Sequence, residues 1–266
     1  AKPLINKLAV HTYPCTGQLL QSEPLVLIHG WGADSGIWEL ILPELTRTLN
    51  ILAIDLPGFG QNDVFKLETD ACSETNTEFS WPIEYYLDTI LAMMPNKCSI
   101  MGWSLGGAIA TALAGRHPSR FSNLITVATN PCFTQQPGWS FGMPDKIFKD
   151  FVTLFNEQPA VCLRRFHALQ CRGDTEERKL FRLLQKGVTE RLKQFTDRKK
   201  NSYCHNAWLR GLELLAEIDN RDTLRKLKIP GLHIFGEVDQ LVNLDCILYT
   251  YTSTRDRTRS RMPSSA

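Results

Sequence analysis

The stretch Gly102-Trp103-Ser104-Leu105-Gly106 decides the fold of this 266-residue chain. It follows a short apolar run at 98–101 that predicts a buried strand, and it precedes residues 106–116, whose small and apolar side chains predict a tightly packed helix. A sharp strand-to-helix turn strains the serine backbone, and larger residues in place of the flanking glycines would collide there. The turn presents the Ser104 hydroxyl at the carboxyl edge of the sheet and frees the Leu105 amide for an oxyanion. We therefore expect Ser104 to be a nucleophile.

Further apolar runs along the chain predict more strands of the same sheet. They lie at residues 25–29, 51–54, 124–128 and 232–235. Helix-like stretches, such as 38–49 and 85–94, lie between them. Continuous apolar strands that alternate with helices are typical of a mostly parallel sheet that helices cover on both faces. The predicted fold class is therefore α/β.

The alternation of strands and helices stops between about residues 133 and 206. This part has no strand-like run and reads as several amphipathic helices. We expect a helical lid at 134–207, inserted into an α/β core made of residues 1–133 and 208–251. Residues 252–266 contain almost nothing that could enter a core and predict a disordered tail. From about residue 245 the chain also lacks the pattern of the last strand and helix that would close such a sheet.

The motif His29-Gly30-Trp31-Gly32 directly follows the run at 25–29. A turn of this kind can aim the Trp31 amide at the same oxyanion position as the Leu105 amide. For His29 we favour a structural role, in which hydrogen bonds from the ring hold the loop, over a role as catalytic base. The Trp31 side chain either walls an acyl pocket or belongs to the core.

An acidic motif, Phe235-Gly236-Glu237-Val238-Asp239, follows the last predicted strand. An acid at this place would orient a histidine through its ring N–H, as the partner of a serine nucleophile. Asp239 fits the expected offset better than Glu237 does. The alternative is a loop carboxylate that caps a helix.

Composition excludes several classes of protein. A hydrophobic fraction of 43% is ordinary for a globular protein, and no apolar run approaches the roughly 20 residues of a membrane helix. The net charge of +2 does not suggest a nucleic-acid binder. Eight scattered cysteines without metal-type spacing, and a start that lacks a secretory signal, predict a cytoplasmic protein with reduced thiols. We expect a monomer that needs neither a metal nor an organic cofactor.

Charge is concentrated in one segment of the expected lid. Residues 164–200 hold twelve Lys and Arg against five Asp and Glu, a net charge of +7. Most charge runs are solvated helix faces. A surface with this charge would also attract an acidic partner electrostatically.

Several motifs together resemble one family in detail. They are Ile28–Gly32, Asp55–Gly60, Gly102–Gly107, Pro131–Phe133 and Arg165–Gln170. The chain resembles the α/β-hydrolase superfamily and, within it, the pimeloyl-[acyl-carrier protein] methyl ester esterases of biotin synthesis, from about Leu25 to Val242. The resemblance implies an α/β-hydrolase fold and a cytoplasmic serine carboxylesterase. Its partner would be an acyl-carrier protein that carries a pimeloyl methyl ester.

The resemblance also implies roles for particular residues. Catalysis would use Ser104 and Asp239, with Trp31 and Leu105 forming the oxyanion hole. Substrate contact is implied for Trp31, Ser104, Leu105, Phe166, His167, Ala168, Leu169 and Gln170. Arg165, Arg178 and Arg182 match arginines that hold the acidic carrier protein, and Arg178 and Arg182 lie four residues apart on one helix face.

The chain departs from the family at the catalytic histidine. That histidine follows the acid in the family, whereas none of the 27 residues after Asp239 is a histidine. The histidines of this chain are His11, His29, His117, His167, His205 and His233. None has the expected position. Two alternatives therefore stay open, a carboxylesterase of other short acyl esters and a catalytically impaired binding protein.

Overall fold

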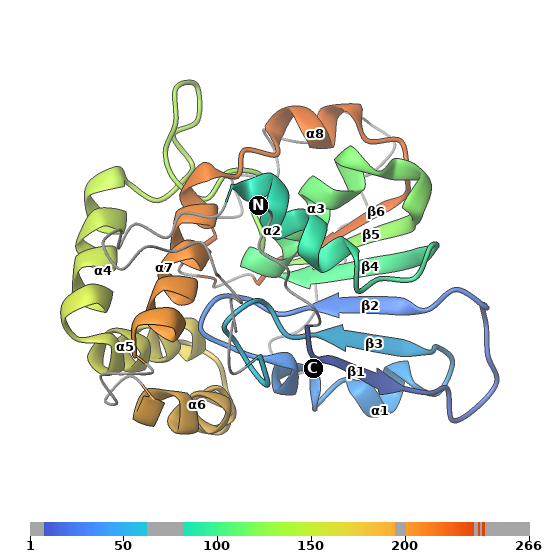
Figure 1. Ribbon diagram of the computed structural model, residues 1–266, viewed down its shortest axis with the longest axis horizontal. Coiled ribbons are helices and arrows are strands. Elements are labelled where there is room, and N and C mark those ends of the chain that lie inside the picture. Colours follow the sequence, from blue (N-terminus) through green and yellow to red (C-terminus); the bar gives the residue numbers. More distant parts are fainter. Residues whose placement is uncertain (1–7, 63–81, 195–200, 237–238, 240, 243–266) are drawn as a thin grey trace, which may run out of the picture.

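A six-stranded sheet forms the centre of the protein, as a computed structural model shows (Figure 1). The structure describes residues 8–62, 82–194, 201–236, 239 and 241–242. In spatial order the strands are β1 (Val10–Tyr13), β3 (Ile51–Ile54), β2 (Leu25–Ile28), β4 (Cys98–Trp103), β5 (Phe121–Val127) and β6 (Gly231–Ile234). β1 runs antiparallel to β3, and the other neighbouring strands are parallel.

The five strands expected from the apolar runs are present, and the α/β fold is confirmed. β1 was not predicted from the sequence. Its residues, Val-His-Thr-Tyr, are only partly buried, because β1 lies at the outer edge of the sheet. An edge strand of four mixed residues lacks the continuous apolar run that marks the buried strands.

Alternate residues of the central strands enter two separate cores. Val26 and Ile28 of β2 pack into the larger core, whereas Leu25 and Leu27 point to the opposite face. This alternation follows from the two-residue period of a strand, and it requires cover on both faces. The short elements η1 (Ser35–Trp38) and α1 (Leu42–Leu45) supply side chains to the smaller core.

The larger core is built around α3 (Leu105–Arg116), which follows β4. α3 contacts β4 and β5 and also α2 (Ile83–Leu91), η2 (Pro118–Arg120) and α8 (Arg221–Lys226). Ten of its residues, Leu105 to Ala114, are buried. Its alanines and glycines permit burial on all sides, because they let neighbouring backbones approach closely.

Gly106 seats the first turn of α3 on the end of β2. A side-chain carbon at this position would collide with the carbonyl groups of Ile28 and His29. The residue must therefore be glycine for the helix to begin so close to the neighbouring strand. The contact holds the start of α3 beside the loop that follows β2.

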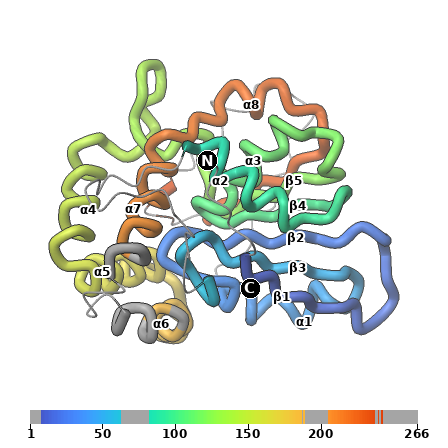
Figure 2. Tube along the Cα trace, in the orientation of Figure 1, coloured from blue at the N-terminus to red at the C-terminus, as the bar shows by residue number. Residues whose placement is uncertain are grey.

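Four helices, which we call the lid helices, lie beyond the carboxyl ends of the parallel strands (Figure 1). They are α4 (Asp145–Glu157), α5 (Pro159–Cys171), α6 (Glu177–Gln194) and α7 (Asn201–Glu217). Figure 2 shows the path from β5 through these helices and back to β6. In α4, Phe148, Phe151, Val152 and Phe155 recur at helical spacing and pack into the larger core. Within the described ranges, no helix is both long and apolar enough to cross a membrane.

The domain boundaries inferred from the sequence stay predictions. α7 runs without interruption from residue 201 to 217, past the expected lid boundary at 207. Residues 252–266, for which we predicted a disordered tail, lie outside the described residues, as does the segment from 243 where the last strand and helix were expected to be missing.

We predict that Gly106→Ala lowers the free energy of unfolding by about 1–3 kcal/mol, because the added methyl group forces α3 away from β2. Urea denaturation of the two proteins at pH 7 measures the difference. Gly236→Ala is the matched control, since a side-chain carbon there would have no neighbour closer than 3.5 Å. Equal effects of the two substitutions would contradict the packing described here.

Candidate active site

Ser104 occupies a strained turn between β4 and α3. Its φ of 53° and ψ of −118° lie in a region that side chains other than glycine rarely adopt. The Ser104 amide donates to the carbonyl of Val127 at the end of β5, at 2.9 Å. The Ser104 carbonyl accepts from Gly107 and Ala108 in the first turn of α3. Strand β5 and helix α3 thus hold the turn in place.

A second strained residue, Ala128, lies directly after β5. Its φ is 46°, and its amide donates to the Ile234 carbonyl of β6 at 2.8 Å. Among the described residues, Ser104 and Ala128 are the only non-glycine residues with positive φ. Both follow parallel strands at the same edge of the sheet. Strain of this kind is concentrated at functional sites.

The loop after β2 packs directly against Ser104. A side-chain carbon on Gly30 would lie 3.1 Å from Cβ of Ser104 and 3.0 Å from the Trp103 ring. A larger residue at this position would therefore crowd Trp103 and Ser104. In the part of the chain that the structure describes, the backbone amides of Trp31 and Leu105 donate no hydrogen bond to another residue. The Leu105 amide directly follows Ser104, and Gly30, which precedes the Trp31 amide, lies against the Ser104 side chain. Their role as an oxyanion hole stays a prediction.

The side chain of His29 holds the loop after β2 in place through hydrogen bonds. Its side chain is fully buried, its Nδ1 lies 2.7 Å from the Gly30 carbonyl, and its Nε2 accepts from the Leu56 amide at 2.9 Å. These bonds require the neutral tautomer with the proton on Nδ1. Both ring nitrogens are therefore bonded to the backbone, which is the structural role that the sequence favoured.

The Trp31 side chain lies inside an aromatic cluster between the loop after β2 and the lid helices. Its ring makes edge-on contacts, with centroids 5.3–5.6 Å apart, to Phe151, Phe155, Phe166 and Trp208. Its Nε1 donates to the Trp208 carbonyl at 2.8 Å, and only 1% of the residue is exposed. In this structure Trp31 is a core residue that joins α4, α5 and α7 to the loop. Its expected contact with substrate stays a prediction.

His167 of α5 forms a second connection between the lid helices and the loop. Its side chain is fully buried. Nε2 lies 2.9 Å from the Gly32 carbonyl, and Nδ1 lies 2.7 Å from the Gln185 amide nitrogen of α6. A neutral imidazole that donates from Nε2 and accepts at Nδ1 satisfies both bonds. Burial lowers the pKa of His167 to about 4, although the bond to Gly32 acts in the opposite direction. His167 therefore stays neutral at pH 7.

The other expected substrate residues of α5 differ in exposure. Phe166 packs on Trp31 and is partly buried, and so are Leu169 and Gln170. Ala168 is exposed. The structure thus brings Phe166 next to Trp31 in the loop after β2, whereas the direct contact of these residues with substrate stays untested.

Asp239 lies in the loop after β6. Its Oδ1 accepts from the amides of Leu241, at 2.8 Å, and Val242, at 3.0 Å. These two bonds form a local turn after the strand, and no described helix begins there, so the helix-capping alternative stays untested. The second carboxylate oxygen makes no hydrogen bond within the described chain. An orienting role for Asp239 toward an imidazole stays a prediction, and Glu237 lies outside the described residues.

The six histidines all fall within the described residues, and none hydrogen-bonds to the Ser104 hydroxyl. Three of them bond to side chains elsewhere: His11 to Asp55, His205 to Asn156 and His233 to Thr126. His117 ends α3, at the far end of the helix from Ser104. The described residues therefore hold no imidazole at the position of a serine's general base.

A small pocket opens beside Ser104 and encloses about 260 Å³, part of it open to solvent. Its lining is mostly apolar, with a few polar groups. The lining residues are Ser104, Ala108, Ala128, Thr129, Asn130, Phe133, Leu215, Ile218 and Val242. The sequence analysis did not find Asn130 or Thr129, although both follow β5 at the carboxyl edge, where ligands bind in α/β sheets. That position was the available signal.

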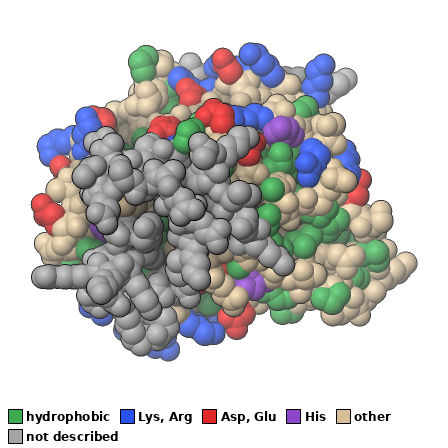
Figure 3. Space-filling model, in the orientation of Figure 1, with side chains coloured by type: hydrophobic (Ala, Val, Ile, Leu, Met, Phe, Trp, Pro, Cys, Tyr) green, Lys and Arg blue, Asp and Glu red, His purple; other side chains and the backbone are tan. Residues whose placement is uncertain are grey.

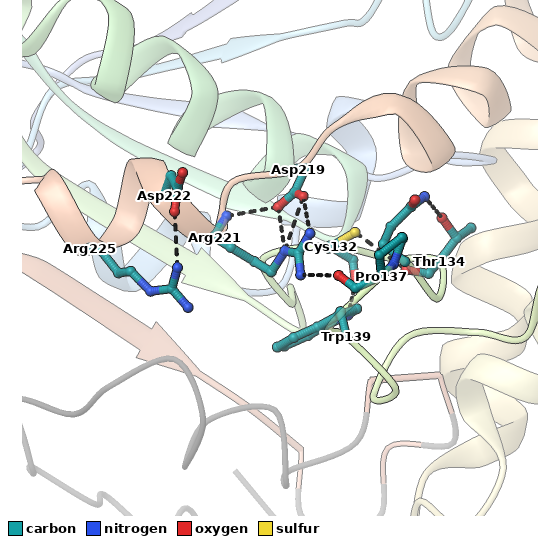
Figure 4. Close-up of polar contacts among 9 residues, drawn as sticks. Cys132, Thr134, Pro137, Trp139, Asp219, Arg221, Asp222 and Arg225 are labelled. Atoms are coloured by element: carbon teal, nitrogen blue, oxygen red, sulfur yellow. Dashed lines mark hydrogen bonds and ion pairs between the residues drawn. The ribbon is translucent and has the colours of Figure 1, made fainter.

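The segment that carries Asn130 is anchored to the junction of α7 and α8 (Figure 4). Asn220 donates from its backbone to the Pro131 carbonyl at 2.7 Å. Arg221 pairs with both carboxylate oxygens of Asp219 and donates to the Pro137 carbonyl, while Trp139 donates to the Cys132 carbonyl (Figure 4). This wall of the pocket is therefore held from outside by fixed polar contacts.

The three arginines expected to bind a carrier protein are exposed. Arg165 lies on α5, and Arg178 and Arg182 lie on α6. None of the three forms an ion pair within the described part of the chain. Basic and acidic side chains alternate on the lid side of the face in Figure 3. Over the residues that the structure describes, no three His, Cys, Asp or Glu side chains gather as metal ligands would.

Comparison with known sequences identifies relatives over most of the chain. The model of the alpha/beta hydrolase fold family matches residues 23–253. The biotin biosynthesis bifunctional protein BioHC of Teredinibacter turnerae is 37% identical over 91% of this chain, which spans only 40% of that protein. The pimeloyl-[acyl-carrier protein] methyl ester esterase of Aeromonas hydrophila is 34% identical over 84% of this chain and 79% of its own length.

Solved structures share the fold at lower identity. An esterase from Exiguobacterium antarcticum superimposes with a TM-score of 0.68 at 19% identity, over 91% of this chain and 82% of its own. A hydrolase from Oleispira antarctica gives a TM-score of 0.64 at 20% identity, over 91% and 81% of the two chains. These similarities show the architecture alone.

We predict that His167 makes stability depend on pH between 4 and its ordinary pKa of 6.5. In this window the unfolded chain binds a proton that the folded chain excludes, so the free energy of unfolding falls as the pH is lowered. Over the whole window the loss approaches about 3 kcal/mol. Urea denaturation at several pH values should show a flatter dependence for His167→Gln.

His117→Gln is the control, because His117 is only partly buried at the end of α3. This variant shows what the removal of a histidine outside the contact between α5 and the loop does to the same measurement. The account of His167 would be wrong if the free energy of unfolding of His167→Gln fell with decreasing pH, between pH 6.5 and 4, as steeply as that of the unsubstituted protein.

Proposed function

Because the chain belongs to the alpha/beta hydrolase fold family, we propose that it is a serine carboxylesterase with Ser104 as its nucleophile. The observation that carries this proposal is the strained turn at Ser104, which lies between two backbone amides, those of Trp31 and Leu105, that have no partner in the described chain. A strained serine beside two free donors matches the requirements of acyl transfer.

The proposed reaction proceeds in two steps. The Ser104 oxygen attacks the ester carbonyl, and the amides of Trp31 and Leu105 donate to the oxyanion that forms. The alcohol leaves with a proton, and water then hydrolyses the acyl-enzyme to a carboxylate and returns the serine hydroxyl. Each oxyanion donor contributes about 10²–10³ in rate. The Ser104 proton has to pass to the leaving alcohol, and none of the six histidines is placed to carry it. Asp239 is the proposed acid of the catalytic pattern, but no histidine of the chain lies where Asp239 could orient it.

The proposed substrate is the methyl ester of a pimeloyl chain on acyl-carrier protein, with pimeloyl-acyl-carrier protein and methanol as products. Support comes from the names of the relatives in Teredinibacter and Aeromonas, at 37% and 34% identity. Of these, the Aeromonas esterase is matched over 79% of its length. We place the reaction in the cytoplasm, as in biotin synthesis, and expect the protein to act as a monomer without a cofactor.

The exposed face of α6 supports docking of an acidic carrier. Arg178 and Arg182 lie one turn apart, and they, like Arg165 on α5, have no ion-pair partner within the described ranges. Cations that are not paired within the protein are available to an anionic partner. Such charges mainly raise the association rate and fix orientation.

A second candidate function is a catalytically impaired protein that binds the acylated carrier without hydrolysing it. One observation favours it: none of the six histidines hydrogen-bonds to Ser104. Loss of the histidine of a comparable triad costs on the order of 10⁶ in turnover. Hydrolysis of other short acyl esters is the third possibility, and comparison of carrier-bound with free methyl esters separates it from the first.

We predict that a fluorophosphonate forms one covalent adduct with this protein and none with Ser104→Ala. Reaction requires an activated serine hydroxyl, which an inert side chain does not supply. Intact mass before and after treatment measures the adduct. Ser122→Ala is the control and should keep the adduct. An unmodified mass for the unsubstituted protein would reject the esterase and leave the binding protein.

We predict that Arg178→Glu with Arg182→Glu raises the KM for a carrier-bound methyl ester at least tenfold and leaves the kinetics of free dimethyl pimelate unchanged. The reversed charges repel the acidic carrier, whereas the small ester does not contact α6. Lys146→Glu with Lys149→Glu, on exposed ion-paired positions of α4, is the matched control. Unchanged turnover of the carrier-bound ester would reject docking on α6.

A further inference from the structure

The side chain of Asn130 is buried beside Ser104 without a partner for its amide nitrogen. Asn130 is 5% exposed, and its Nδ2 forms no hydrogen bond within the part of the chain that the structure describes. It lines the same pocket as Ser104. Buried amide donors in folded proteins are nearly always satisfied, because loss of hydrogen bonds to water destabilises the folded state. A donor left open in a pocket therefore indicates a ligand that accepts from it.

The other polar groups of the pocket are already engaged or assigned. The Thr129 hydroxyl lies 2.9 Å from the Val127 carbonyl and 3.1 Å from the Ser104 carbonyl. Ser104 supplies the nucleophile. The remaining walls are apolar, with Ala108, Phe133, Leu215, Ile218 and Val242 among them. Asn130 is thus the polar group that can select an oxygen of the ligand in otherwise apolar surroundings.

The order of the strands in the sheet indicates which oxygen of a bound ester lies on the side of Asn130. The oxyanion loop follows β2, Ser104 follows β4, and Asn130 follows β5, so that the loop and Asn130 lie on opposite sides of the serine. The carbonyl oxygen of a bound ester is directed to the loop amides. The alkoxy oxygen then faces β5 and β6, the side of Asp239, from which a leaving alcohol receives its proton.

We propose that Asn130 is a specificity-determining residue that donates a hydrogen bond to the alkoxy oxygen of the bound ester. The pocket beside it receives the alcohol portion. Phe133 and Ile218 line this pocket, and its apolar walls suit a short alkyl group such as methyl. This inference rests on the proposed esterase function, because it requires an ester at Ser104.

The segment that carries Asn130 is held in a fixed position, as discrimination between ligands requires. Asn220 bonds to the Pro131 carbonyl and to the Ala108 carbonyl, at 2.7 and 2.9 Å, and so ties both sides of the pocket together. The bidentate Arg221–Asp219 pair holds the next residues (Figure 4). A fixed donor loses little entropy on binding, and discrimination between ligands requires such a fixed position.

The experiment compares two ligands that differ only in the atom between each carbonyl group and its terminal methyl group. Dimethyl pimelate has an alkoxy oxygen where undecane-3,9-dione has a methylene group, and both have the same carbonyl spacing. Binding is measured by ¹H–¹⁵N NMR on Ser104→Ala, which cannot hydrolyse the ester. Asn130→Leu, which keeps the volume and removes the donor, assigns the Asn130 side-chain amide. Thr129→Val is the matched pocket control.

The expected result is a downfield shift of the Asn130 side-chain amide with the diester and not with the dione. The diester should bind roughly three- to tenfold more tightly than the dione. This preference should vanish in Asn130→Leu and persist in Thr129→Val. The amide shift is measured on the protein that retains Asn130. It therefore tests the hydrogen bond to the alkoxy oxygen even where Asn130→Leu does not fold.

Two outcomes overturn the inference, and they differ in what they leave standing. Binding of the diester without a change in the chemical shift of the Asn130 side-chain amide would show that this donor does not bond to the ester. The proposed esterase function would then be unaffected. Absence of binding by both ligands, with no shift near residue 104, would reject the ester site and with it the proposed function.

Discussion

The first turn of α3 rests on the carbonyl groups at the end of β2, and the place of Ser104 depends on this contact. Gly106 leaves no room for a side chain there, and Gly30 brings the loop after β2 close to Ser104. Two glycines on separate elements thus bring a helix start and a loop to the same point. The strain at Ser104 persists because β5 and α3 both hold its backbone.

Much of the core and the strained turn at Ser104 could be predicted from sequence, because both leave local signals. Buried parallel strands are continuous apolar runs, and the turn at Ser104 needs glycines at fixed offsets. β1 has neither signal, since an edge strand is only half covered. Whether Trp31 faces substrate or core depends on aromatic rings more than 100 residues away in sequence, which no local pattern reveals.

Asn130 illustrates a different limit of prediction from sequence. Its residue type is ordinary after a strand, and its distinction is that a buried donor lacks a partner, which only three-dimensional placement can show. The same limit applies to the arginines of α6. Their spacing predicts a shared helix face, but that they form no ion pair with a described carboxylate had to come from the structure.

The bond between His167 and the Gly32 carbonyl has a consequence for the modularity of this protein. A lid that is inserted into an α/β core is a segment that protein engineers would try to replace with the lid of a related protein in order to change specificity. Here a grafted lid without an imidazole at position 167 would leave a buried carbonyl unsatisfied in the loop that presents the Trp31 amide. Chimeras would therefore have to transplant the lid together with this loop, as a single cassette.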